Sequence, residues 1–441
     1  MAATAGAATP PATVTLAPFQ EYRFETPLLA ADPVTVTLSK GRAEIFGAEL
    51  APGRAYTFPP GKAEAVFTFH GCALEIVGRM SHAYVASDTP MPSYLQLHAR
   101  LDAMRMAGRP PRVLVAGPAD TGKSSLCRTL ANWMARSGHA GTLVDLDVGA
   151  GELAVPGALA AAPVGRPLDA ERGTEELSPL CFWFGHPAVG GSATGDHVPQ
   201  FRRLVASLAA AVGRRHGGGL AAGGGAGGPN PPPPGGVVIN TVGWVDGAGY
   251  DLLLQQADAF DADVIVVIGD DRLHSQLSAA AEQSNKKPTV VKLAKSGGVV
   301  HRSDDAKRVG RVARLREYFY GVPGDLCPHA TTVDFDALQV YIVTKAPQAP
   351  SSALPLGMQV PQEQLAATRV TAAISLLNAV LAVVLTSSSK CDDLLAAPAA
   401  GFVYVSAVDV ETGKVTLLAP SPAALPSNVL LSGAIKEMGL V

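Results

Sequence analysis

The chain has 441 residues, a formal net charge of −3 and a sequence pI near 6.4. This length allows two to four domains that each bury a hydrophobic core. The small net charge excludes a global attraction to nucleic acid, so any site for a polyanion must be local. The five cysteines lack the C-x-x-C spacing of zinc sites and indicate reduced thiols in a cytosolic or nuclear protein.

The N-terminal part has the pattern of a small β-domain. Residues 1–12 are rich in Ala, Thr and Pro, which predicts a disordered tail, and structure should begin near Phe19. From there to Ser87, short alternating runs of apolar and polar residues are separated by Gly and Pro, as in antiparallel strands joined by turns. Apolar residues at helical spacing follow at 94–104. We therefore expect a β-sandwich and a linking helix over residues 13–108.

A phosphate-binding motif follows this helix. Residues 117–125 read G-P-A-D-T-G-K-S-S and match G-x-x-x-x-G-K-[ST] at each fixed position. The apolar run 113–116 before it suits a buried parallel strand, and a helical pattern comes after it. This context supports an anion site at a helix N-terminus, where Lys123 reaches the β- and γ-phosphates and Ser124 offers its hydroxyl to Mg²⁺. The alternative is an ordinary strand-to-helix turn.

The middle of the chain, residues 109–321, predicts a mostly parallel α/β sheet, because short β-branched runs alternate with helical patterns. The further strands are expected at Thr142–Leu146, Val237–Asn240, Val264–Ile268 and Thr289–Leu293. Runs of Gly and Pro at 217–236 predict a disordered surface loop inside this domain.

The last part, residues 322–441, shows strand patterns but no catalytic motif, so we expect a small α/β or β-rich domain that serves packing or docking. Its most apolar stretch, 370–385, has 16 residues. That is shorter than the roughly 20 residues of a membrane-spanning helix, so a buried helix or a strand pair is expected there.

Two carboxylates, Asp145 and Asp147, end a predicted strand. Ligands of such sheets bind at the carboxyl ends of the strands, so Asp147 should lie opposite the phosphate loop. It can then hold the water shell of the metal or accept a proton. The alternative is an aspartate that caps the next turn.

Another strand end carries an aromatic residue that can contact a nucleic-acid base. Trp244 follows a glycine there, and its flat face suits stacking on a base, which is worth roughly 1–3 kcal/mol. The alternative is a tryptophan that packs beneath a loop.

The only concentrated basic run lies at residues 295–316. Arg308, Arg311 and Arg314 share one side at helical spacing, and Gly297 with Gly298 can act as a hinge. A mobile basic helix would form a lid whose arginines neutralise charge on a transferred phosphoryl group. The alternative is a solvated helix face.

Over nearly its full length the chain resembles the eukaryotic polyribonucleotide 5′-hydroxyl-kinase family, whose members are also the kinase-like subunit of mRNA cleavage factor II. Stretches in all three expected domains carry the resemblance. They are A-E-I-F-G-A-E-L (43–50), H-G-C (70–72), D-T-P-M (88–91), the phosphate loop with Asp120, D-L-D-V-G (145–149), V-P-G (155–157), I-N-T-V-G-W (239–244), K-S-G-G-V-V (295–300), R-E-Y-F-Y-G (316–321) and L-P-L-G-M (354–358).

The resemblance implies a fold and an activity. The fold is of the α/β class, with a central P-loop NTPase-type parallel sheet between an N-terminal β-sandwich and a small C-terminal domain. The activity is an ATP- and Mg²⁺-dependent RNA 5′-hydroxyl kinase of the nucleus, acting in mRNA 3′-end cleavage, polyadenylation and tRNA splicing. Its implied partners are the RNA 5′ end, the cleavage factor II scaffold subunit and the tRNA-splicing endonuclease complex, with no membrane.

The resemblance also assigns roles to individual residues. ATP is bound by Gly117, Asp120, Thr121, Gly122, Lys123, Ser124 and Ser125, and its adenine by the Glu21–Glu25 region and Lys62. Asp147 activates the 5′-hydroxyl and, with Ser124, serves the metal, while Thr241 and Trp244 contact the RNA. The lid is formed by Arg302, Lys307 and Arg308.

The chain departs from the family pattern at two positions. Ala150 stands where the family usually has Gln, so an amide that can orient metal water or substrate is missing. Lys307 stands where the family usually has Arg, which keeps the charge but loses the planar fork. Two hypotheses remain open: an active kinase, and an ATP-binding scaffold subunit of the cleavage complex with weak or no turnover. A GTPase-type switch is weak, because the chain shows no N-K-x-D-like sequence.

Overall fold

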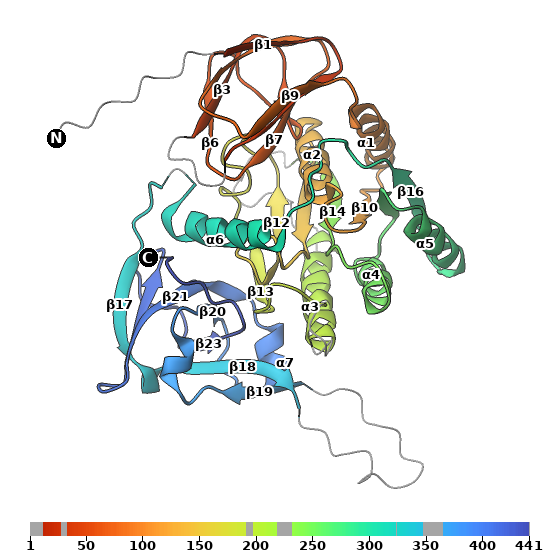
Figure 1. Cartoon of the computed structure of the whole chain (residues 1–441). Helices are drawn as coiled ribbons and strands as arrows, with labels where there is room; N and C mark the ends of the chain where they lie inside the picture. The colour runs from red at the N-terminus through yellow and green to blue at the C-terminus, as the bar shows by residue number, and fades with distance from the viewer. Residues whose placement is uncertain are drawn as a thin grey trace, which may run out of the picture.

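The computed structural model describes residues 12–27, 33–190, 197–217, 232–322, 324–346 and 365–440. Most of the expected tail, most of the Gly/Pro segment at 217–236 and the L-P-L-G-M stretch lie outside these ranges. The chain runs from an N-terminal β region through a central α/β region to a C-terminal β-rich region (Figure 1).

The N-terminal region is a sandwich of two antiparallel sheets. The first has the order β1 (Ala12–Leu16), β8 (Cys72–Val77), β3 (Val34–Gly41), β6 (Ala55–Phe58). The second has the order β5 (Ala48–Glu49), β4 (Glu44–Ile45), β7 (Ala63–Thr68), β2 (Gln20–Glu25), β9 (His82–Ala86). The prediction that structure begins near Phe19 is wrong. Strand β1 starts at Ala12 and pairs with β8 along its whole length, although only its last residue, Leu16, is buried.

The central sheet contains five parallel strands, as predicted. Their order is β16 (Thr289–Leu293), β15 (Val264–Ile268), β10 (Arg112–Ala116), β14 (Pro234–Asn240), β11 (Ala140–Asp145). The middle strands are apolar runs because helices cover both faces of a parallel sheet. Strand β10 lies between β14 and β15, so the chain reverses its direction of winding there, which is where ligands bind in such sheets.

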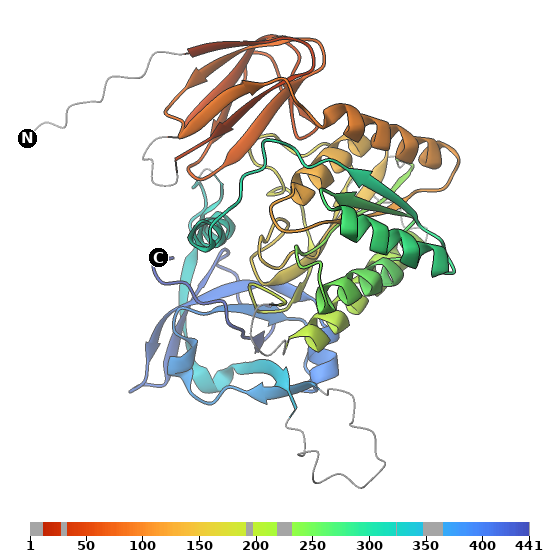
Figure 2. The ribbon, with the colours of Figure 1, turned by 45° about the vertical axis from the view of Figure 1, so that its right-hand side comes forward.

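Helices pack around this sheet (Figure 2). The linking helix α1 (Met91–Met106) packs on α2 (Lys123–Arg136), which contacts β10, β11 and β14. The remaining helices of the region are α3 (Val198–Gly217), α4 (Ala248–Ala259) and α5 (Asp271–Gln283). No helix within the described ranges combines the length and apolar character needed to cross a membrane.

The sheet continues into the C-terminal region, which the sequence did not predict. Beyond β11, the antiparallel strands β12 (Ala158–Val164) and β13 (Leu180–Trp183) lead to β21 (Ala399–Asp409) through the pair Cys181 and Ala399. Strand β12 is mostly alanine, a residue depleted in strands, so its identity as a strand depends on its neighbours.

The described part of the C-terminal region is β-rich and includes the short helix α7 (Cys391–Ala396). Its other strands are β17 (His329–Asp334), β18 (Gln339–Lys345), β19 (Leu365–Arg369), β20 (Val380–Val384), β22 (Lys414–Ala419) and β23 (Val429–Leu431). The apolar stretch 370–385 forms a 3-10 turn at Ala373–Leu376 and the single buried strand β20, in place of the expected helix or strand pair. The α/β fold class with an N-terminal sandwich is confirmed.

Residues 295–320, called the basic segment below, contain helix α6 (Asp304–Tyr320), which lies where the three regions meet (Figures 1 and 2). Ser303 caps the helix by accepting a hydrogen bond from the amide of Ala306. The helix contacts the N-terminal sandwich through Glu317 and the C-terminal strand β21 through Tyr318, whose hydroxyl accepts from the Phe402 amide. Its position therefore depends on all three regions.

Candidate phosphate-binding and catalytic site

The phosphate loop connects β10 to α2 at the carboxyl edge of the sheet. Gly122 caps α2 with φ 90° and ψ 20°, a left-handed conformation that glycine adopts without strain. No side chain among the described residues caps this helix start, which leaves its first-turn N–H groups available to an anion.

Lys123 is held inside the loop. Its side chain is buried, and its Nζ donates to the carbonyl oxygen of Pro118 at 2.8 Å. The Thr121 hydroxyl donates to the same carbonyl at 2.9 Å. Burial lowers the pKa of Lys123, while the charge of Asp147 opposes that shift. Among the described residues, the Pro118 carbonyl is its one hydrogen-bond acceptor. A desolvated cation held in this way can bind a phosphate.

Asp145 is the last residue of β11, and Asp147 follows it and lies close enough to Lys123 for its charge to act on the lysine. Asp145 is buried and accepts hydrogen bonds from the amides of Asp147, at 3.1 Å, and Glu152, at 3.0 Å. Burial, followed by the charges of Asp147 and Glu152, raises the pKa of Asp145 to about 7. The half-buried Asp147 accepts from the Gly149 amide at 3.1 Å, and burial raises its pKa as well.

Asn240, at the end of β14, connects the two halves of the site. Its Nδ2 donates to Ser124 Oγ at 3.2 Å and to Asp145 Oδ1 at 3.0 Å. Asp145 and Asn240 were absent from the predicted site residues. The D-x-D pattern and a polar residue at a strand end were signals for both, because the carboxyl ends of parallel strands meet at one edge.

The part of the basic segment around the start of α6 lies on the phosphate loop. Arg302 Nε is 3.2 Å from Asp120 Oδ1, His301 Nδ1 is 3.2 Å from Oδ2, and Lys307 Nζ is 4.0 Å from Oδ2. Burial opposes ionisation of Asp120, but the bonds and charge of Arg302 hold the pKa of that carboxyl below its usual value. Arg308 is exposed on α6. The structure therefore brings Arg302 and Lys307 to the loop in one cluster.

The two predicted RNA contacts differ in exposure. Trp244 is half-buried, and a Cβ on Gly190 or Gly249 would lie within 2.7 Å of its ring. The Thr241 side chain is fully buried, and its hydroxyl donates to the carbonyl oxygen of Val115 at 2.9 Å. Part of the Trp244 ring is therefore exposed to solvent, whereas the Thr241 side chain is buried and hydrogen-bonds the end of β14 to β10.

Glu21 and Lys62, the predicted adenine contacts, both lie at the boundary between the sandwich and the basic segment. The buried Glu21 accepts from Arg23 Nε at 2.7 Å, and the side chain of Arg23 lies against Gly298. Lys62 Nζ is 2.8 Å from Glu317 Oε1 on α6. The two residues therefore meet different ends of the basic segment, and their contact with adenine stays a prediction.

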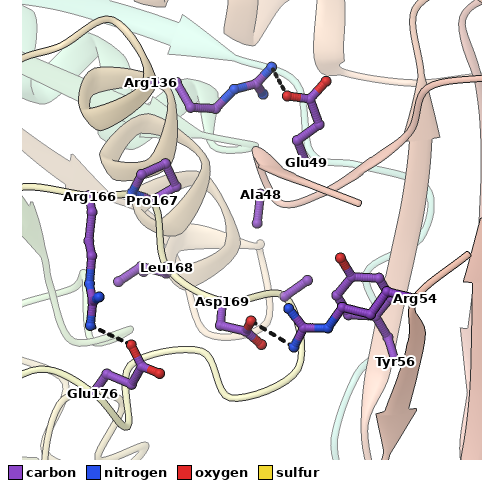
Figure 3. A pocket seen from close by; sticks show the side chains of 11 residues that line it. Ala48, Glu49, Arg54, Tyr56, Arg136, Arg166, Pro167, Leu168, Asp169 and Glu176 are labelled. Atoms are coloured by element: carbon purple, nitrogen blue, oxygen red, sulfur yellow. Dashed lines mark hydrogen bonds and ion pairs between the residues drawn. The ribbon is translucent and has the colours of Figure 1, made fainter. Parts of the chain in front are cut away.

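A separate polar cleft of about 360 Å³ lies between the sandwich and the central region (Figure 3). Three arginines line it, and each is matched by a carboxylate. The pairs are Arg54 with Asp169 at 3.0 Å, Arg136 with Glu49 at 3.6 Å and Arg166 with Glu176 at 2.6 Å. Because these charges neutralise one another, we assign the cleft no ligand.

A phosphate loop with a buried lysine, strand-end carboxylates and a basic segment on the loop define a P-loop nucleotide-binding protein of the kinase type. Three family models match the chain. They describe an N-terminal β-sandwich domain of polyadenylation factor (15–107), the P-loop of mRNA cleavage and polyadenylation factor CLP1 (117–321) and pre-mRNA cleavage complex II protein Clp1 (326–437).

Curated relatives match at nearly full length. The polyribonucleotide 5′-hydroxyl-kinase Clp1 of Xenopus laevis is 40% identical over 95% of this chain and 92% of its own. The CLP1 homolog of Arabidopsis thaliana is 39% identical over 94% and 91%. A solved wild-type Clp1p–Pcf11p (454–563) complex has the same fold, with TM-score 0.80 and 21% identity over 97% of this chain and 98% of that one. The chain belongs to the Clp1 family.

Proposed function

We propose that this protein transfers the γ-phosphoryl group of ATP to the 5′-hydroxyl of an RNA chain. The observation that carries the proposal is the buried Lys123 in the phosphate loop, which lies close enough to the Asp147 carboxylate for that charge to act on it. The names of the relatives at about 40% identity support the same reaction.

The ATP phosphates would lie on the amides of Gly117–Ser125, with Lys123 leaving the Pro118 carbonyl to contact them. The adenine would lie between the sandwich and the basic segment, near Glu21 and Lys62. Closing the cluster of Arg302 and Lys307 over the loop would set cations beside the transferred group, where they stabilise its charge.

The residues at the loop also fit Mg²⁺. Ser124 Oγ and the Asp147 carboxylate are hard oxygen donors, which this ion prefers. Within the described residues, no group of three or more His, Cys, Asp or Glu side chains could hold a metal alone. Such a sparse protein donor set is typical of an ion shared with substrate phosphates. When bound, Mg²⁺ neutralises charge on those phosphates.

The RNA end would enter between Asp147 and Trp244. The Asp147 carboxylate would accept the proton of the attacking 5′-hydroxyl, as a positioned base does in other phosphoryl transfers. Trp244 would stack on the terminal base. Thr241 would act indirectly, because its buried hydroxyl fixes the loop that carries Trp244. Arg308 would reach the RNA or its phosphate from the exposed side of α6.

We propose a nuclear location and a place in the pre-mRNA 3′-end cleavage machinery, bound to a cleavage factor II scaffold subunit. The description of the C-terminal family model supports this, as does the solved complex of a relative with Pcf11p. Acting with the tRNA-splicing endonuclease complex is a further part of the proposal. A second candidate function is an ATP-binding scaffold with little turnover, which the absence of a side-chain amide at Ala150 favours.

The test is phosphate transfer to a defined RNA. Purified protein would be incubated with γ-labelled ATP, Mg²⁺ and a 5′-hydroxyl oligoribonucleotide, with Lys123→Ala as the control. We expect label on the RNA with the wild-type chain and a loss of at least about 100-fold in Lys123→Ala, the scale of removing one preorganised electrostatic group. Label no higher than in that variant would reject the kinase and favour the scaffold.

A further inference from the structure

Asn240 stands out at the site because the nitrogen of its side-chain amide is hydrogen-bonded and the oxygen is not. The residue is 3% exposed, at the carboxyl end of β14. Its Nδ2 has two acceptors, Ser124 Oγ and Asp145 Oδ1. Its Oδ1 is buried and has no hydrogen-bond partner among the described residues. A buried amide oxygen without a donor costs roughly 1–3 kcal/mol, so it calls for a ligand.

The orientation of this amide follows from its neighbours. Both oxygens of Asp145 already accept hydrogen bonds from backbone amides. The side of Asn240 that faces Asp145 is the NH₂ group, which donates to Oδ1 at 3.0 Å. The same NH₂ group donates to Ser124 Oγ at 3.2 Å and occupies one lone pair of that hydroxyl. The hydroxyl keeps a second lone pair for a cation. The carbonyl oxygen of the amide is left on the other side, without a donor.

A matched residue shows what a purely structural asparagine does in this chain. Asn132 in α2 is fully buried, like Asn240, but both of its amide ends are paired. Its Nδ2 donates to the Phe46 carbonyl at 2.8 Å, and its Oδ1 accepts from the Leu168 amide at 2.7 Å. Asn240 differs from it in having an unpaired oxygen and a contact with the phosphate loop.

We propose that Asn240 is a positioning residue for the divalent cation that accompanies ATP. Its Nδ2 holds the Ser124 hydroxyl and Asp145 in place, and its Oδ1 accepts a hydrogen bond from a water molecule bound to that cation. This inference rests on the proposed ATP site but needs no turnover. Residues in such an outer position commonly change metal affinity by about 10- to 100-fold when they are replaced.

The test separates metal-assisted from metal-free nucleotide binding. The dissociation constant for ATP would be measured by titration calorimetry in Mg²⁺ and in EDTA, for the wild-type chain, Asn240→Leu and Asn132→Leu. We expect Asn240→Leu to lose about 10- to 100-fold of the gain in affinity that Mg²⁺ provides, with a much smaller change in EDTA. Asn132→Leu should lower stability but keep the wild-type ratio of the two constants.

Asn240→Asp keeps an oxygen acceptor at the same place but loses the Nδ2 donor to Ser124 and Asp145. It should therefore recover part of the Mg²⁺ dependence that Asn240→Leu loses, which a merely structural role would not produce. Asn240→Ala, which lacks any side-chain acceptor, repeats the comparison if Asn240→Leu does not fold. The inference would be overturned if the ratio of the ATP dissociation constants in EDTA and in Mg²⁺ were the same in Asn240→Leu and Asn132→Leu. It would also be overturned if Mg²⁺ did not change the ATP affinity of the wild-type chain. A wild-type chain that binds Mg²⁺ and ATP through Asn240 but labels no RNA would reject the kinase and leave this inference standing.

Discussion

Arg314 links helix α6 to the segment between β11 and β12, and we expect Arg314→Met to make local opening of the helix more frequent. The guanidinium donates to the Glu317 carboxylate and, at 2.6 Å, to the carbonyl oxygen of Glu152 in the turn after β11. Its Nη2 is also 3.9 Å from the Glu152 carboxylate. The substitution removes these contacts while keeping most of the side-chain volume.

The size of the effect follows from burial. Removing one partner of a buried ion pair lowers stability by about 3–5 kcal/mol. The Arg314 side chain is 21% exposed, and Glu317 keeps Lys62 at 2.8 Å, so we expect the lower value of about 2–3 kcal/mol. At 1.4 kcal/mol for each tenfold change, the helix should open about 30- to 150-fold more often.

Amide hydrogen exchange of α6 measures this opening locally, without assuming that three regions unfold together. Arg316→Met is the control, because Arg316 is exposed on the same helix and makes a surface hydrogen bond to the Gly439 carbonyl at 2.9 Å. Its exchange should change by less than about threefold, as for most surface substitutions. Exchange in Arg314→Met that is no faster than in Arg316→Met would refute this account of the helix.

Two further outcomes are expected. A Cβ at Gly243 would lie 2.6 Å from the backbone nitrogen of Ala119 in the phosphate loop. Overpacking of this kind costs roughly 1–3 kcal/mol, so Gly243→Ala should weaken ATP binding by about 5- to 150-fold. Calorimetry would check this, with Gly213→Ala, whose Cβ would meet nothing within 4 Å, as the unaffected control. Burial, followed by the charge of Arg105, lowers the pKa of His98 to about 4. As the pH falls below 6.5, His98 is therefore protonated in the unfolded chain before it is protonated in the folded one. The free energy of unfolding should then fall from pH 6.5 toward pH 4 by up to about 1.4 kcal/mol per pH unit. Urea unfolding at several pH values should show a smaller slope in His98→Gln, and an unchanged slope would contradict this origin.

The phosphate loop and the parallel strands could be predicted because their signals are local. The loop motif occupies consecutive residues, and a strand buried on both faces reads as a short apolar run, as in Val264–Ile268, whose bounds agree with the prediction. Strand β12 gave no such signal, since its alanines fit a strand only between β11 and β13. Strand β1 was missed because its pairing with β8 brings together segments about 60 residues apart.

The sequence by itself determined the chemistry at the site: a lysine and a serine in a glycine loop, carboxylates at a strand end and a run of basic residues. Only the tertiary structure decided which of these groups contact one another. It joins Asn240 to Ser124 and Asp145, Lys62 to Glu317, and Arg302 to Asp120. Motifs report the residue types that a short segment needs, whereas these contacts link residues that are roughly 100 or more positions apart. Their pairing depends on the strand order and on the place of α6 between the three regions.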